Sequence, residues 1–143
     1  MFDVVSWVAG MRRALPTSRH EVEDIRARLD YELGRARRYG GSLSAILVQG
    51  VAPSGNASGD WGLFTAELTQ SLRLWDMSWI QSDRVLLLLP HTDLSARRRV
   101  IERILQAADT MRVETRISAS TFPDEAPTGD ALLESLLDPP RVA

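Results

Sequence analysis

The most continuous run of hydrophobic residues lies in the middle of the chain, at residues 85–89 (VLLLL). Polar, turn-forming residues precede this run and Pro90 follows it. Five apolar residues bounded in this way are typical of a central strand that is covered on both faces of its sheet. The shorter segment Met77–Ile80 comes just before, and the polar residues 81–84 between the two favour a tight turn. The pattern therefore predicts a hairpin whose second strand is buried.

Amphipathic helices are predicted on both sides of this hairpin, because apolar residues recur every three or four positions. The predicted helices cover residues 19–39, 61–75, 93–108 and 130–137, and further strands cover residues 43–48 and 113–120. The third helix begins at Asp93 or Ser95. The apolar side chains that we expect to face the core from the second and third helices are Leu63, Phe64, Leu68, Leu72, Leu94, Val100, Ile101, Leu105 and Ala108. The order of elements favours an α/β fold with a mixed central sheet flanked by helices.

Residues 1–15 form a separate segment ahead of Pro16. Its apolar residues Phe2, Val5, Val8 and Ala9 recur at helical spacing. We therefore expect an extra N-terminal amphipathic helix at residues 1–15, followed by one domain at residues 16–143. The helix could pack on the domain, pair with a second copy, or continue a longer signalling helix. Because an exposed apolar face needs a partner, we expect a homodimer.

The composition excludes several kinds of chemistry. All 17 cationic residues are arginine, so there is no lysine for a Schiff base or for a phosphate-binding P-loop. The absence of cysteine removes thiolate catalysis, disulfides and cysteine-based zinc sites, and it fits a reducing cytoplasm. No apolar run reaches transmembrane length. We expect a cytoplasmic protein with no membrane insertion and no nucleic-acid partner.

Several strings of residues, taken in order, resemble the GGDEF domain of diguanylate cyclases. They are residues 29–44 (LDYELGRARRYGGSLS), 85–94 (VLLLLPHTDL), 101–104 (IERI), 117–120 (ISAS) and 131–134 (ALLE). The resemblance spans residues 15–137. It implies a GGDEF-like α/β fold, a bacterial signalling context and cyclic di-GMP as the related nucleotide.

The positions that carry catalysis in this family differ in this chain. Active members have an aspartate that holds magnesium at the end of the first strand; here the residue is Gln49, which brings no charge to a divalent cation. The hairpin signature is replaced by residues 81–85 (QSDRV), so Arg84 stands where a glutamate would share the metal. Phosphoryl transfer with two metal ions needs those carboxylates. The resemblance, with these departures, therefore implies an inactive domain that has no catalytic residues, no metal and no cofactor.

The inhibitory, product-binding site of the family has a counterpart in Arg73-x-x-Asp76, a pair at helical spacing just before the hairpin. Arginine can donate to O6 and N7 of guanine, and a carboxylate can accept from N1–H and N2–H. In this family an arginine from the helix after the hairpin often completes the site. Arg103 lies at the matching place, with Arg99 one turn earlier. The resemblance thus predicts a cyclic di-GMP receptor or sensor that uses these four residues.

A second interpretation requires no nucleotide. An arginine and an aspartate three positions apart often form a surface ion pair that contributes little to stability. Trp75 and Trp79 can pack in the core or at an interface instead of stacking on a base. In that case the chain is a structural module for dimerisation or for docking a partner protein, and residues 1–15 and the tryptophans provide its contacts.

Overall fold

The computed structural model describes residues 19–51, 60–81 and 83–137. Its elements in chain order are α2 (Arg19–Tyr39), β1 (Leu43–Gly50), α3 (Trp61–Gln70), β2 (Met77–Ile80), β3 (Arg84–Pro90), α4 (Leu94–Thr110), β4 (Thr115–Phe122) and α5 (Gly129–Leu137). The bounds of α2 and β2 match the predicted ones, and the other predicted elements are present with shifted ends. The predicted helix at residues 1–15 and the predicted domain boundary lie outside the described residues.

The strands form one four-stranded sheet in the order β2-β3-β1-β4, and every strand pair in it is antiparallel. The predicted α/β class is confirmed, but the prediction of a mixed sheet is wrong. Helices do connect parallel strands here, because α3 joins β1 to β2 and α4 joins β3 to β4. However, β3 lies between β1 and β2 in the sheet, and β1 lies between β3 and β4. Neither parallel pair is therefore hydrogen-bonded.

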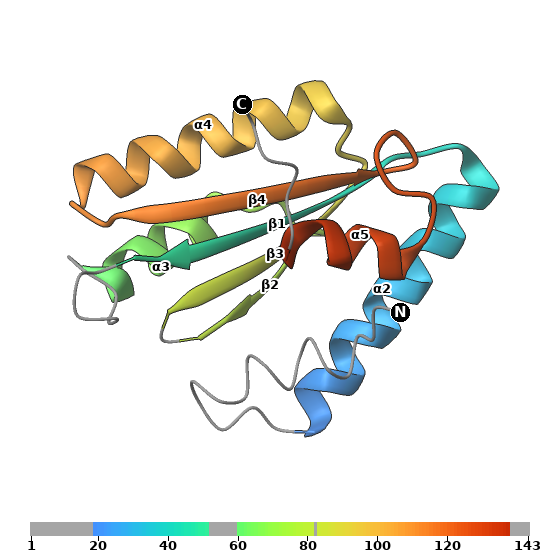
Figure 1. The fold of residues 1–143 in the computed structure, drawn as a ribbon, viewed down its shortest axis with the longest axis horizontal. Helices are drawn as coiled ribbons and strands as arrows, with labels where there is room; N and C mark the ends of the chain where they lie inside the picture. The colour runs from blue at the N-terminus through green and yellow to red at the C-terminus, as the bar shows by residue number, and fades with distance from the viewer. Residues whose placement is uncertain (1–18, 52–59, 82, 138–143) are drawn as a thin grey trace.

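Two layers of helices cover the sheet, with α2 and α5 on one face and α3 and α4 on the other (Figure 1). Side chains along β3 alternate between the two cores, as the pleat of a strand requires. Leu86 and Leu88 belong to the core under α2 and α5, whereas Leu87 and Leu89 belong to the core under α3 and α4. The predicted central strand with two covered faces is confirmed. Within the described part of the chain, no helix is long and apolar enough to cross a membrane.

Three leucines that were predicted to face the core are exposed instead. Leu63 in α3 is 58% exposed, and Leu94 and Leu105 in α4 are 39% and 50% exposed. In α4 the fully buried pair is Ile104 and Ala108, which are four residues apart. Neighbouring residues in a helix are rotated by about 100°. Turning Ile104 toward the sheet therefore carries Leu105 away from it, and the same holds for Leu63 beside the buried Phe64.

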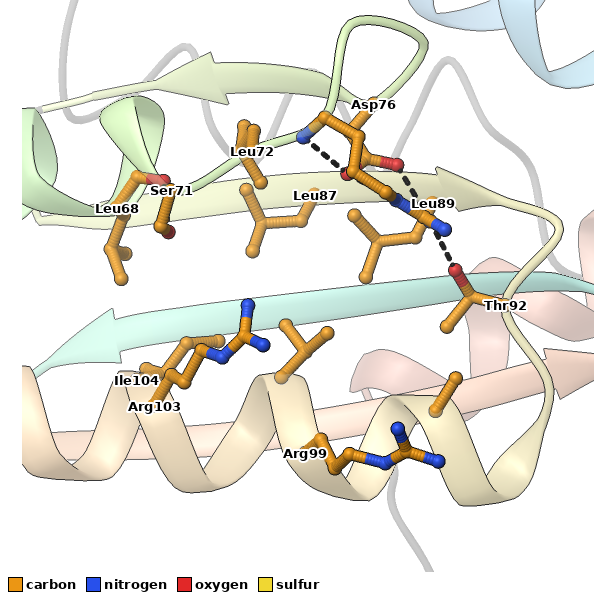
Figure 2. Close-up of a pocket in the computed structure, with 13 residues that line it drawn as sticks. Leu68, Ser71, Leu72, Asp76, Leu87, Leu89, Thr92, Arg99, Arg103 and Ile104 are labelled. Carbon is orange, nitrogen blue, oxygen red and sulfur yellow. Dashed lines mark hydrogen bonds and ion pairs between the residues drawn. The ribbon is translucent and has the colours of Figure 1, made fainter.

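The connection from β3 to α4 is short and brings α4 back along the sheet. His91 has a φ of 54°, in the left-handed region, and reverses the chain directly after Pro90. Asp93 then caps α4, because its carboxylate accepts a hydrogen bond from Ala96 N at 2.9 Å. Asp93 was one of the two residues at which this helix was predicted to begin. The reversal places the first turns of α4 beside the segment that follows α3 (Figure 2).

Candidate ligand-binding site

Residues 71–76 form a turn between α3 and β2, and not the further helix that was predicted. The turn is closed from both sides, because Asp76 N donates to Arg73 O at 3.0 Å and Arg73 N donates to Asp76 Oδ2 at 2.9 Å. A separation of three residues brings two side chains together in a helix and in a tight turn alike. The spacing therefore predicted the contact but not the backbone that makes it.

Arg73 and Asp76 form a two-pronged ion pair with each other. Arg73 Nη2 lies 3.0 Å from Asp76 Oδ1, and Arg73 Nε donates to Oδ2 at 3.1 Å. The Asp76 side chain is 5% exposed and that of Arg73 is 41% exposed. Arg73 Nη2 also donates to Pro90 O at 2.9 Å and to Thr92 Oγ1 at 2.6 Å, and the guanidinium lies 5.3 Å from the centre of the Trp75 ring. The guanidinium is thus held on several sides, while its Nη1 donates to none of the described residues.

A cavity of about 160 Å³ lies beside this ion pair, between the end of α3, β3 and α4 (Figure 2). Its lining residues are Leu68, Ser71, Leu72, Arg73, Asp76, Leu87, Leu89, Thr92, Ala96, Arg99, Val100, Arg103 and Ile104. Leu87 and Leu89 from β3 and Ile104 from α4 give the cavity an apolar floor. An apolar surface with a few charged groups at its edge suits a flat, polar-edged ring such as a nucleobase.

The four residues that the sequence predicted as ligand-binding all line this cavity. Arg99 and Arg103 come from α4, where their spacing puts them on one face, and Figure 2 shows both side chains extending from α4 on the cavity side. No hydrogen bond or ion pair joins either arginine to another described residue. With Arg73 and Asp76 they give the lining three positive charges and one negative charge, a net charge of +2 that attracts anions.

The sequence did not reveal Thr92, the residue on which Arg73 rests. Thr92 is 1% exposed, and its hydroxyl accepts a hydrogen bond from Arg73 and donates one to Pro90 O at 3.2 Å. Thr92 and Arg73 are 19 positions apart, so no local spacing connects them. The available signal was a polar residue placed between a buried strand and the cap of the next helix.

The other end of β3 carries the positions at which the catalytic residues of the GGDEF family were expected. Gln49 pairs directly with Arg84 across β1 and β3, and with Arg116 across β1 and β4. Arg84 Nε and Nη2 each donate to the Asp83 carboxylate at 3.2 Å. Searching the described ranges for three or more His, Cys, Asp or Glu side chains that could hold a metal ion finds no such group. The register thus places an amide beside a guanidinium at this end.

Trp75 and Trp79 lie outside the cavity. Trp75 is 49% exposed and meets His91 edge-on, with 6.4 Å between ring centres. Trp79 is half-buried against the core of α2, and its Nε1 donates to Asp24 Oδ2 at 3.2 Å. Neither ring lines the cavity. Trp79 packs against the core and Trp75 makes a surface contact, and neither residue is placed to stack on a ligand in this cavity.

Comparison with solved structures identifies the fold. A DGC protein from Thermotoga maritima has a TM-score of 0.69 at 16% identity, over 81% of this chain and 91% of that chain. A sensory box/GGDEF family protein from Caulobacter crescentus has a TM-score of 0.62 at 12% identity, over 78% and 84% of the two chains. PelD from Pseudomonas aeruginosa, in complex with c-di-GMP, has a TM-score of 0.59 at 20% identity, over 89% of this chain and 47% of that chain.

These likenesses show that the chain has the fold of GGDEF domains, as the resemblance in the sequence implied. The chain spans about half of the PelD chain that it matches. The sequence itself matches no protein-family model and no curated protein. At identities of 12–20% the comparisons establish the fold alone.

Proposed function

We propose that the chain is a cyclic di-GMP receptor without cyclase activity. The observation that supports this most is that Arg73, Asp76, Arg99 and Arg103 meet at one cavity, although they come from a turn and a helix separated by β2 and β3. The net charge of +2 on the lining complements the two negatively charged phosphates of this ligand. About half of the PelD chain, in a structure that contains c-di-GMP, has the same fold.

Arg73 and Asp76 recognise the guanine base in this proposal. Arg73 donates to O6 and N7, and Asp76 accepts from N1–H and N2–H. These bonds replace contacts that the two side chains make with each other in this structure. Solvent screens the ion pair on the side of Arg73, which is 41% exposed, whereas the Asp76 carboxylate is 5% exposed and needs new donors when the pair opens. The guanine N1–H and N2–H groups supply those donors, and a bidentate base contact contributes about 1–3 kcal/mol.

Arg99 and Arg103 supply charge for the phosphates or for a second base edge. Both are exposed, and neither has to break an interaction with a described residue in order to turn toward a ligand. A guanidinium can bind a phosphate through two parallel hydrogen bonds. The apolar floor of Leu87 and Leu89 then contacts the face of the base.

Catalytic silence is the second part of the proposal. Gln49 offers a neutral amide and Arg84 a positive charge, at positions where the GGDEF family uses carboxylates to bind magnesium. Incubation with GTP and either magnesium or manganese should therefore yield no cyclic di-GMP above a control without protein. Product formed by the natural chain would contradict this assignment of Gln49 and Arg84.

Thermal denaturation with matched nucleotides tests the receptor function. Cyclic di-AMP is the matched control, because it carries the same phosphates but presents an amino donor where guanine presents O6. Cyclic di-GMP should raise the melting temperature in a concentration-dependent way, and cyclic di-AMP should raise it less at equal concentration. Equal shifts would contradict base recognition by Arg73 and Asp76. No shift with either nucleotide at about 1 mM would contradict the receptor itself.

A second candidate function, a docking or dimerisation module, is favoured by apolar side chains beside the edge strand β2. Leu74 is 97% exposed, and Trp75 and Ile80 are 49% and 46% exposed. An exposed apolar edge is a surface that a partner or a second copy can cover. Under this function, light scattering should give the mass of a dimer at micromolar concentration, and deleting residues 1–15 should shift the mass toward a monomer. A monomeric mass for the full chain would contradict self-association.

A further inference from the structure

A line of buried hydrogen bonds connects the candidate site to the far edge of the sheet. Thr92, Ser44 and Thr121 follow one another along it, and their exposures are 1%, 0% and 0%. They come from three places, namely the β3–α4 connection, the start of β1 and the end of β4. Ser44 Oγ lies 2.7 Å from Thr92 O and 2.8 Å from Thr121 Oγ1. The three residues therefore form one continuous buried hydrogen-bond path.

The direction of each hydrogen bond in this path follows from its chemistry. A carbonyl oxygen can only accept, so Ser44 uses its single hydroxyl hydrogen to donate to Thr92 O. Thr121 must then donate to Ser44, and Thr121 Oγ1 accepts in turn from Arg97 Nη1 at 3.0 Å. All the bonds point the same way, from Arg97 to Thr92, and aligned bonds of this kind strengthen one another.

The outer end of the path is anchored by charge. Arg97 Nη1 forms an ion pair with Glu125 Oε1, and the same carboxylate oxygen accepts from Thr121 N at 3.0 Å. The Arg97 side chain is 18% exposed, which leaves it partly shielded from solvent. Arg97 thus binds the Thr121 hydroxyl, and Glu125 binds the Thr121 backbone N–H.

The inner end of the path is Arg73. The Thr92 hydroxyl accepts from Arg73 Nη2, while the Thr92 carbonyl is held by Ser44. Moving Thr92 would leave a buried carbonyl without its partner, which is costly. The position of the hydroxyl that Arg73 contacts is therefore fixed by bonds that extend across the sheet.

We propose that Thr92 is a positioning residue, whose hydroxyl fixes the Arg73 guanidinium at the cavity and is itself fixed by the path through Ser44 and Thr121 to Arg97. Without this contact the Arg73 guanidinium keeps its ion pair with Asp76 but loses one of the bonds that hold Nη2, and a ligand must then bear more of the entropic cost of ordering it. The effect on ligand affinity rests on the proposed receptor function, whereas the order of the Arg73 side chain does not.

Affinity for cyclic di-GMP, measured by calorimetry, gives the first test. Thr92→Val removes the hydroxyl and keeps the shape, whereas Thr92→Ser keeps the hydroxyl. We expect Thr92→Val to weaken binding about tenfold and Thr92→Ser to weaken it by no more than about twofold. In an Arg73→Ala background, Thr92→Val should have no further effect. An equal loss in both backgrounds would show that Thr92 acts on the fold and not through Arg73, and would overturn the proposal.

The second test needs no ligand. The Nε–Hε signal of Arg73 in a nitrogen-15 NMR spectrum, assigned by its loss in Arg73→Ala, reports whether the guanidinium is ordered. It should exchange slowly with water in the natural chain and in Thr92→Ser, and faster in Thr92→Val. An unchanged signal in Thr92→Val would overturn the proposal. If the natural chain binds no cyclic di-GMP but the signals change as expected, the receptor function fails and the positioning role stands.

The outer end of the path offers a matched pair of variants. Arg97 and Arg98 are neighbours on α4, but Arg98 is exposed and takes no part in the path, since no hydrogen bond or ion pair joins it to a described residue. Arg97→Gln should speed the exchange of the Arg73 Nε–Hε signal, and Arg98→Gln should leave it unchanged. Equal effects of the two variants would show that lost charge, and not the hydrogen-bond path, controls Arg73.

Discussion

Each end of β3 has an arginine that is paired with an aspartate close to it in sequence. Arg73 pairs with Asp76 beside Pro90, and Arg84 pairs with Asp83 at the opposite end. The two ion pairs have similar lengths, with closest N–O distances of 3.0 and 3.2 Å. An ion pair by itself therefore does not distinguish a binding site from a surface contact.

The surroundings of the two pairs do make the distinction. Arg73 borders a cavity with an apolar floor, and two further arginines line that cavity without partners among the described residues. Arg84 lies across from Gln49 at the end of the sheet, where the GGDEF family would have carboxylates. The α4 helix causes this difference, because it starts directly after β3 and carries Arg99 and Arg103 along one end of the strand only. In this chain the topology concentrates positive charge at the cavity beside Arg73.

The largest expected effect comes from truncating the two arginines in parallel. Arg73→Ala removes the guanidinium that contacts the base and should weaken cyclic di-GMP binding by about tenfold to a hundredfold. Arg84→Ala removes the same group at the other end of β3 and should leave the affinity unchanged. Fluorescence or calorimetric titration measures both. Similar losses from both variants would mean that the ligand does not distinguish the two ends.

A smaller loss is expected from Asp76→Asn, which keeps the shape of the side chain. The amide oxygen accepts more weakly than a carboxylate, and the NH2 group opposes the N–H donors of guanine. We expect about a tenfold loss of affinity for cyclic di-GMP. The matched change Asp83→Asn at the other end of β3 should have no effect on affinity. A variant Asp76→Asn that binds as tightly as the natural chain would exclude the carboxylate from base recognition.

The smallest expected loss concerns Arg103, which is exposed and solvated. Arg103→Ala should weaken binding by about fivefold at low salt, because an exposed guanidinium–phosphate contact contributes about 1 kcal/mol. The difference from the natural chain should shrink as salt rises, since added ions screen the attraction. Arg98→Ala on the outer part of the same helix is the control. Loss of affinity that does not depend on salt would show that Arg103 acts by packing and not by charge.

Much of the fold could be predicted because its signals are local. The apolar residues Ile25, Leu29 and Leu33 recur along α2 and are all buried, and Gly40, with a φ of 73°, follows the end of the helix. The end of α3 was harder to predict. Leu72 lies four residues after the buried Leu68, which is the spacing of a continuing helix. However, α3 ends before Leu72, and this residue lies in the following turn, where it lines the cavity. Periodicity cannot tell these two backbones apart.

The sequence predicted the residues of the candidate site and the contact between Arg73 and Asp76, but not the contact between Arg73 and Thr92. Arg73, Asp76, Arg99 and Arg103 were located by resemblance, and the structure brings them to one cavity. The hydrogen bond from Arg73 to Thr92 joins residues 19 positions apart and depends on how β3 and α4 meet, which no local pattern encodes. Local patterns also could not predict that all strand pairs are antiparallel, because this depends on the order of the strands in the sheet.

The most direct test of the central claim is a calorimetric titration of the natural chain with cyclic di-GMP at low salt. We expect saturable heat with a dissociation constant below about 1 mM, and weaker binding of cyclic di-AMP under the same conditions. Absence of heat and of any thermal shift at that concentration would contradict the receptor function and leave the docking module as the function of this chain.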